Sequence, residues 1–201
     1  MGTGLTTGPH CARAFSLALQ ATSAGAAPEV LRQLASRSEN LPRLIQGIGI
    51  AGDPVHVPWL VTHMGELSTT RLAGEAFTLI TGADLGQEAL DRAAPENFEI
   101  GPTDDPDDPN VDMDPDDGLP WPDSQKIEVW WAANGSRFQK GTRYFMGAPV
   151  TREHCVDVLK NGYQRQRILA AHYLCLLQPG TPLFNTSAPA WRQQKLLGEI
   201  E

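Results

Sequence analysis

Apolar residues recur every three or four positions along most of the chain, which is the spacing of one face of an α-helix. Before residue 84 this pattern predicts five short helices. Their apolar stripes are Ala12, Phe15 and Leu19; Val30, Leu31 and Leu34; Leu41, Leu44, Ile45 and Ile48; Val57, Leu60, Val61 and Met64; and Leu72, Ala76, Leu79 and Ile80. Helical spacing returns after residue 122, with helices predicted to begin near Asp123, Thr151 and Tyr163 and a short extended segment within residues 141–147. The pattern predicts an all-α fold.

The residues between the third and fourth predicted helices indicate how the helices are connected. Gly52 suits the left-handed backbone that ends a helix, Asp53 suits the N-cap position, and Pro54 suits the first helical turn, where its missing N–H is not needed. A connection this short places successive helices antiparallel, and each pair has an apolar face that it cannot bury alone. Stacking of such pairs produces an α-solenoid.

Residues 84–122 interrupt the helical pattern, because prolines and glycines recur there among acidic residues and predict a loop without regular secondary structure. Eight of its aspartates are concentrated within residues 104–117: Asp104, Asp105, Asp107, Asp108, Asp112, Asp114, Asp116 and Asp117. The chain is therefore expected to divide into helical repeats over residues 9–83, an acidic Pro/Asp-rich loop over residues 84–122, and a C-terminal helical repeat region over residues 123–201.

The acidic loop carries the whole charge imbalance of the protein. The formal net charge is −8, and without the eight aspartates the remaining acidic residues equal the 16 Lys and Arg residues in number. A body that is neutral outside an acidic loop disfavours binding to nucleic acid, which requires a basic surface. The charge distribution instead favours another protein with a basic surface as the partner.

Cysteine usage and hydropathy indicate the cellular compartment in which the protein is expected. Three cysteines without CxxC spacing, Cys11, Cys155 and Cys175, indicate neither a disulfide framework nor a zinc site, which favours a reducing environment. No window approaches the roughly 18 apolar residues of a membrane span, and the N-terminus lacks the pattern of a secretory signal. We expect a cytoplasmic protein that does not enter a membrane.

Residues 49–60, which read GIAGDPVHVPWL, are similar to the G-D-P-x-x-x-P-x-L signature of HEAT-like repeats of the phycobilisome-lyase type. Residues 71–76 resemble the second helix of such a unit, in which small side chains allow close helix approach. The order of residues 119–123, 130–131, 141–144, 164–167 and 179–184 is similar to the C-terminal half of an uncharacterised family of proteobacterial HEAT-repeat proteins. The resemblance covers roughly residues 40–195.

This resemblance implies a HEAT-like α-solenoid of antiparallel helix pairs, interrupted by the acidic loop. Members of the family are commonly longer, so the chain is expected to be a short member or a C-terminal piece. Some members resemble accessory genes of type VI secretion clusters, which implies an interaction role such as an adaptor or immunity protein. Because related repeats also occur in bilin lyases, a lyase-like enzyme is the alternative that the resemblance leaves open.

The acidic loop is also compared with a calcium-binding loop. Asp112, Asp114, Asp116 and Asp123 occupy positions 1, 3, 5 and 12 of an EF-hand pattern, but Asp117 stands where the pattern requires glycine. A calcium-responsive module and an acidic surface that docks a basic partner are the two interpretations. For the second interpretation, Asp112, Asp114, Asp116 and Asp117 are candidate interaction residues.

No set of residues in the sequence indicates catalysis. The five histidines lack paired-ligand spacing, and neither a glycine-rich phosphate loop after a strand nor a G-x-S-x-G motif is present. His56 and His63 are expected at exposed helix positions, and His172 in the core. We therefore expect a non-enzymatic scaffold without a cofactor or a metal.

Two adjacent tryptophans provide a second candidate interaction site. Trp130 and Trp131 point about 100° apart on a helix, so they cannot both face one core. Tryptophan and arginine are frequent binding anchors, so Trp130, Trp131, Arg137 and Arg143 form a candidate interaction patch. The alternative is that both tryptophans cover the junction beneath the acidic loop.

Overall fold

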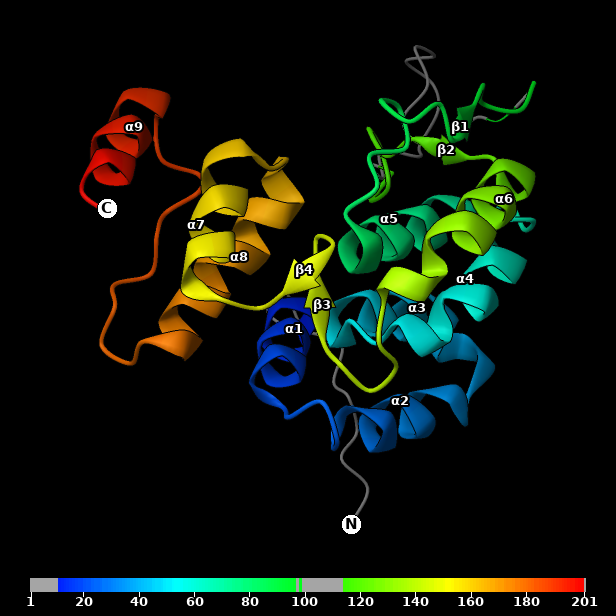
Figure 1. Cartoon of the computed structure of the whole chain (residues 1–201), viewed down its shortest axis with the longest axis horizontal. Coiled ribbons are helices and arrows are strands. Elements are labelled where there is room, and N and C mark those ends of the chain that lie inside the picture. The colour runs from blue at the N-terminus through cyan, green and yellow to red at the C-terminus, as the bar shows by residue number, and fades with distance from the viewer. Residues whose placement is uncertain (1–10, 97, 99–113, 201) are drawn as a thin grey trace, which may run out of the picture.

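The structure is a computed structural model that describes residues 11–96, 98 and 114–200, and it is mostly helical (Figure 1). The α-helices of the described residues are α1 (Cys11–Ala21), α2 (Ala27–Ala35), α3 (Leu41–Ala51), α4 (Val57–His63), α5 (Thr70–Thr81), α6 (Ser124–Asn134), α7 (Arg152–Asn161), α8 (Gln164–Leu177) and α9 (Ala190–Gly198). Short 3₁₀ helices cover Ser38–Asn40 (η1), Pro54–His56 (η2) and Gly135–Arg137 (η3). The prediction of an essentially helical fold is confirmed.

The connection between α3 and α4 forms as the sequence predicts. Gly52 ends α3 in the left-handed conformation, with φ of 73°. The Asp53 carboxylate then accepts a hydrogen bond from the Val55 amide at 3.0 Å, and Pro54 occupies the first turn of η2, which leads into α4. A Cβ atom on Gly52 would collide with the carbonyl oxygen of Tyr144, so glycine is required here by packing as well as by backbone conformation.

Helices α1–α6 surround a first hydrophobic core. Helix α2 packs on α3, α4 packs on α5, and the two pairs meet through α3 and α5. Gly49 permits this contact, because a Cβ atom there would lie 2.9 Å from the Cα atom of Ala76. The expectation that small residues allow close helix approach is confirmed at this crossing.

A second hydrophobic core lies between α7 and α8 and is closed by Phe145 and Phe184, with Leu79 from the end of α5. Helix α6 does not join it, because Ile127 is fully buried in the first core and Trp130 and Trp131 pack against that core. The predicted C-terminal region over residues 123–201 is therefore not one packing unit. Tyr144 packs against the first core and Phe145 belongs to the second, so the two cores meet at the hairpin β3 (Tyr144–Phe145) and β4 (Ala148–Pro149).

The expectation that no regular element forms within residues 84–122 is wrong for the described part. Strands β1 (Asp91–Arg92) and β2 (Trp121–Pro122) form a short antiparallel pair, with Arg92 opposite Trp121. Pro122 can occupy a strand position because a two-stranded ribbon consists of edges. Leu85 and Leu90 are also buried in the first core. The two ends of the acidic loop are thus held together on the body of the protein (Figure 1).

The C-terminal helices differ from the sequence prediction in two respects. Apolar spacing predicts a stripe of Ile168, Ala171, His172 and Cys175 in helix α8, with Leu176 alongside. Helix α8 instead buries Leu169 through Leu174 against α7 and α1, and Ile168 and Leu176 are 37% and 41% exposed. Helix α8 packs on more than one side, so its burial does not follow a single stripe. Helix α9, which was not predicted, buries none of its residues.

Candidate functional site

The predicted aromatic patch is built into the body of the protein. Trp130 is half-buried, stands edge-on to Phe77 with ring centroids 5.4 Å apart, and donates its indole N–H to Glu88 at 2.5 Å. Trp131 is also half-buried and stacks on Phe138, with centroids 5.6 Å apart. Both tryptophans therefore pack against the first core, and both are half-buried.

The two arginines of that patch have different surroundings. The partly buried guanidinium of Arg143 donates to the carbonyls of Ala51, Gln20, Leu19 and Thr22 over 2.7–3.1 Å. These carbonyls belong to the C-terminal ends of α1 and α3, where the helix dipole favours a cation. Arg143 thus joins the β3 segment to two helix ends. Arg137 is exposed and hydrogen-bonds the Asn134 side chain at 3.1 Å.

The acidic loop is anchored by Arg71, a buried residue of α5 that the sequence analysis did not identify as functional. Arg71 makes an ion pair with Asp114 at 2.7 Å and donates to the backbone carbonyl of Asp116 at 2.9 Å. Its guanidinium carbon lies 5.1 Å from the ring centroid of Phe98 and 5.0 Å from that of Trp121. Phe98 precedes the segment 99–113 and Asp114 follows it, so one arginine holds both of its ends.

A second arginine, Arg165 of α8, extends this anchor. Its guanidinium lies 3.0 Å from the Glu75 carboxylate and 3.9 Å from that of Asp116, and it also donates to the Pro115 carbonyl. Burial raises the pKa of Glu75, and Arg165 opposes that shift. Burial likewise raises the pKa of Asp116, against the opposing effect of Arg165 and Arg71. Asp114 and Asp116 of the loop thus meet basic residues of the same chain.

Asp114 behaves differently from its neighbours. Desolvation acts to raise its pKa, but hydrogen bonds from the Asp116 amide and from Arg71, together with the charge of Arg71, outweigh desolvation, so the pKa of Asp114 is lowered. Asp114 is therefore held as a carboxylate in its ion pair with Arg71. Asp117 is exposed, and Asp112 lies outside the described residues.

The calcium interpretation can be compared with these positions. Asp114 is paired with Arg71, and Asp123 caps α6 by accepting from the amides of Gln125 and Lys126 at 3.1 and 3.2 Å. Within residues 11–96, 98 and 114–200, no three His, Cys, Asp or Glu side chains are grouped so as to hold a metal ion. The described part of the loop therefore gives the calcium alternative no geometric support.

The histidines and the central cysteine have packing roles in the described structure. His172 is buried and its Nδ1 lies 3.1 Å from Gln20 Oε1, which confirms the prediction of a core histidine with a partner. The expectation that His56 and His63 are exposed is wrong, because both are half-buried; His63 packs on Trp59, with ring centroids 4.1 Å apart. Cys155 is fully buried, and burial raises its pKa to about 12, so it is not a thiolate nucleophile.

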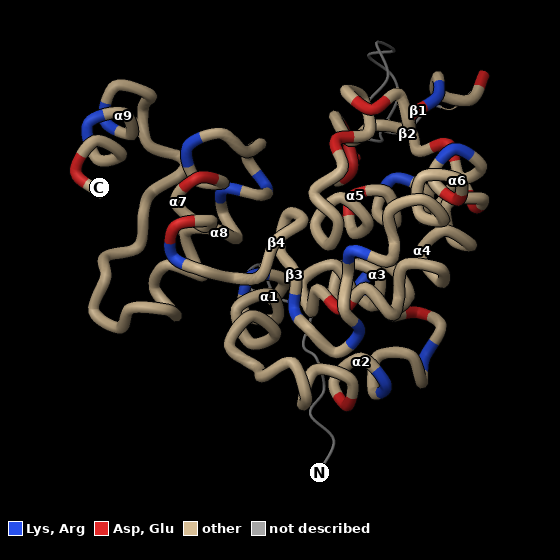
Figure 2. Tube along the Cα trace, viewed as in Figure 1, with Lys and Arg blue, Asp and Glu red and all other residues tan. Residues whose placement is uncertain are grey.

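A groove lies between the end of α5 and the α7–α8 turn. It consists of two pockets of about 500 and 440 Å³ that share Thr78, Asp84, Tyr163 and Gln166 in their walls. The Tyr163 hydroxyl donates to Asp84 at 3.0 Å where the pockets meet. Figure 2 shows acidic positions on the α5 side and on α7. We refer to these two pockets together as the interhelix groove.

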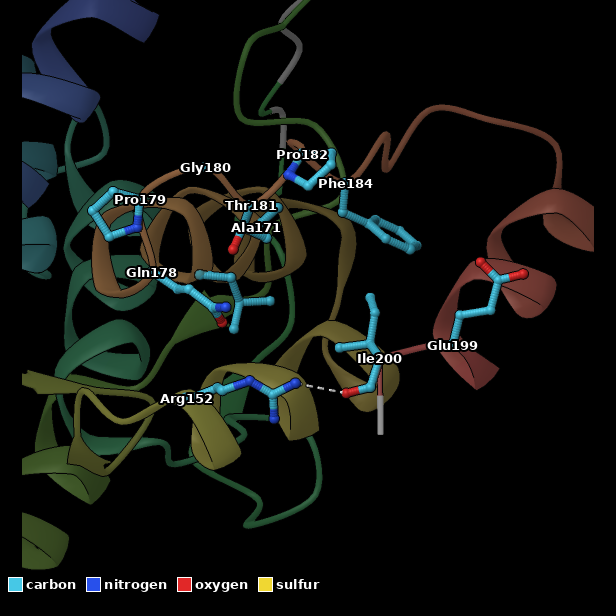
Figure 3. A pocket seen from close by; sticks show the side chains of 11 residues that line it. Arg152, Ala171, Gln178, Pro179, Gly180, Thr181, Pro182, Phe184, Glu199 and Ile200 are labelled. Atoms are coloured by element: carbon cyan, nitrogen blue, oxygen red, sulfur yellow. Dashed lines mark hydrogen bonds between the residues drawn. The ribbon is translucent and has the colours of Figure 1, made fainter.

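A separate pocket of about 470 Å³ lies between α8, the segment that follows it, and the end of α9 (Figure 3). Leu174, Phe184, Pro179 and Pro182 provide its apolar walls. Arg152 stands at one side and donates to the Ile200 carbonyl at 2.9 Å, which ties the end of α9 to the start of α7. Of the described residues that the sequence analysis selected as interaction candidates, Asp117 lines the interhelix groove and none lines this pocket.

Comparison of the chain with family models, with curated proteins and with solved structures gave no match. In the described part of the chain, no helix has the length and apolar character needed to cross a bilayer.

Proposed function

We propose that this chain is a non-enzymatic protein-binding module of HEAT-like helix pairs. The arrangement of its first core supports this architecture, because the pairs α2–α3 and α4–α5 stack through their second helices, α3 and α5. Stacking of successive pairs is how repeat proteins bury a shared core while they leave an extended surface for partners.

The observation that carries the proposal is where large apolar side chains remain exposed. Of the nine such residues in the described chain, five lie between residues 168 and 191: Ile168, Leu176, Leu177, Leu183 and Trp191. We refer to these five as the C-terminal apolar residues. Ile168 and Leu183 line one pocket, and Trp191 is 70% exposed on α9. Exposed large apolar side chains are frequent at interaction sites, and tryptophan is a common anchor in them.

The proposed partner is another protein with a basic surface, since the formal net charge of the chain is −8. The family resemblance adds the context of this proposal, which is an accessory, adaptor or immunity-type role linked to type VI secretion in the cytoplasm.

Affinity capture tests the proposal. The bait is the full chain, used as wild type, as the double variant Leu183→Asp with Trp191→Ala, and as Val129→Asp on α6. Val129 is 71% exposed and lies outside the C-terminal apolar residues, so it is a matched control. We expect a partner retained by the wild type and by Val129→Asp to be lost from the double variant. Retention of the same partners by all three baits would contradict the proposal, provided that circular dichroism shows all three to be folded.

A further inference from the structure

The interhelix groove has a strongly one-signed charge. Four carboxylates are among the residues that line it, from Glu75, Asp84, Asp117 and Asp157, whereas Arg165 is its single Lys or Arg. Arg165 already pairs with Glu75 at 3.0 Å. The groove therefore presents a net charge of −3 from its Asp, Glu, Lys and Arg side chains.

The partners of the two central carboxylates in the described structure are neutral. Asp84 accepts hydrogen bonds from the Tyr163 hydroxyl at 3.0 Å and from the backbone N–H of Gln87 at 2.9 Å. Asp157 accepts from the Asn161 side chain at 2.8 Å. Neither carboxylate has a Lys or Arg of the described chain within ion-pair distance, in contrast to Asp114 with Arg71. Both therefore retain acceptor capacity that a cation from outside the chain can use.

Two helix ends add to the negative potential. Gly82 caps the C-terminus of α5 and Gly162 caps the C-terminus of α7, and both line the larger pocket of the groove. The C-terminal end of a helix carries a partial negative charge and stabilises a nearby cation. The carboxylates and the two helix dipoles thus act in the same direction at one concave site.

From this charge complementarity we infer that the interhelix groove docks a segment of the partner protein that carries lysine or arginine side chains. The inference rests on the proposed protein-binding function and names the site and the chemistry of the partner. The two adjoining pockets, of about 500 and 440 Å³, have room for successive side chains of an extended segment. Tyr163, which is 66% exposed, lies where the pockets meet and provides an aromatic wall for the aliphatic part of a lysine or arginine side chain.

Peptide titration followed by amide NMR spectra tests the inference. The probe is an acetylated and amidated Gly-Arg-Gly-Arg-Gly peptide, and its neutral isostere contains citrulline in place of arginine. We expect amide chemical-shift changes centred on Gly82, Asp84, Gly162 and Tyr163. The dissociation constant of the citrulline peptide is expected to be at least about tenfold larger than that of the arginine peptide, because a hydrogen bond to a charged group contributes more than a neutral one. Equal affinity for both peptides, or shifts centred elsewhere, would overturn the inference.

Two matched double variants test whether peptide binding depends on the carboxylates of the groove. Asp84→Asn with Asp157→Asn removes two groove carboxylates and keeps their size, whereas Glu39→Gln with Glu128→Gln removes two exposed carboxylates outside the groove. We expect the first pair of substitutions to weaken binding of the arginine peptide about tenfold or more, and the second pair to weaken it less than about threefold. Equal weakening by both pairs would show that only net charge matters and would overturn the inference.

Two further comparisons separate the remaining outcomes. Agmatine, a free guanidinium amine, is expected to bind more weakly than the peptide, and equal binding would identify a small amine as the occupant and overturn the peptide assignment. The Leu183→Asp with Trp191→Ala variant is expected to bind the arginine peptide as the wild type does. Failure of the groove experiment and failure of the affinity capture at the C-terminal apolar residues are therefore distinguishable.

Discussion

Helices α5 and α9 show how differently two regions of this molecule are packed. Ten of the twelve residues of α5 are buried, and α3, α4, β2 and β3 all pack on it. None of the nine residues of α9 is buried, and its main apolar contacts are the partly buried Leu196 and Leu197 at the edge of the second core. We infer that α5 sustains the fold, whereas the region around α9 retains apolar surface that a partner can cover.

The largest expected effect comes from a cavity beside α5. Phe77 is fully buried and contacts Trp130 edge-on, so Phe77→Ala removes both apolar area and an aromatic contact. We expect it to lower the free energy of unfolding by about 3–5 kcal/mol, measured by urea denaturation. Leu196→Ala at the contact of α9 is the matched comparison, with an expected loss below about 1 kcal/mol because that side chain is only partly buried. Similar losses in both variants would remove the proposed difference between the two helices.

Arg143 is the next test, because it joins the helical pairs to the β3 segment. Arg143→Ala leaves carbonyls at the ends of α1 and α3 without their donor, and we expect a loss of roughly 2–3 kcal/mol in the free energy of unfolding. Arg137→Ala is the control, since Arg137 is exposed and its hydrogen bond is to a neighbouring side chain. A loss of stability in Arg143→Ala similar to that in the control would show that the carbonyls find other partners.

Local signals account for the parts of the fold that the sequence predicted. Gly52, Asp53 and Pro54 define a helix end and a helix start within three residues, and the structure has both. Helix α9 was not predicted, although it is about as amphipathic as α7, and it buries none of its nine residues. Apolar spacing and capping signals therefore located helices that contribute to the two cores and did not reveal the one that contributes no buried residue.

The candidate sites were less predictable because they depend on residues that are far apart in sequence. Arg71 meets the backbone of Asp116 across 45 positions, and Arg143 meets Gln20 across 123. Arg71 lies outside the predicted apolar stripe of α5, so local spacing did not mark it as a buried charge that requires a partner. The interhelix groove joins Asp84 to Tyr163, which no local pattern connects.

The ion pair between Arg71 and Asp114 gives a smaller effect with a pH signature. Asp114→Asn is expected to lower the free energy of unfolding by roughly 1–2 kcal/mol at neutral pH, because Arg71 loses the negative charge of its ion-pair partner. The pKa of Asp114 is lowered in the folded state, so its stabilising contribution is complete above the unfolded value of 3.8 and is lost as the pH falls through the folded pKa.

Urea denaturation between pH 2 and pH 7 checks this dependence, and the difference between wild type and Asp114→Asn should shrink below about pH 3.8. Glu75, whose pKa is raised, contributes in the opposite direction, but it is present in both proteins and cancels in the comparison. Asp116 cancels only in part, because the charge of Asp114 contributes to its raised pKa. A difference that stays constant down to pH 2 would show that the ion pair does not stabilise the fold.

The smallest expected effect on stability is that of Trp191→Ala on α9. Trp191 is 70% exposed, so truncation creates no cavity, and we expect the free energy of unfolding to change by less than about 0.5 kcal/mol. The comparison with Phe77→Ala is sharp because both variants remove a large aromatic side chain, one buried between helices and one exposed. If Trp191→Ala instead costs as much as a core substitution, then α9 is an integral part of the second core. In that case its tryptophan is a packing residue, and it is not available as an anchor for another protein.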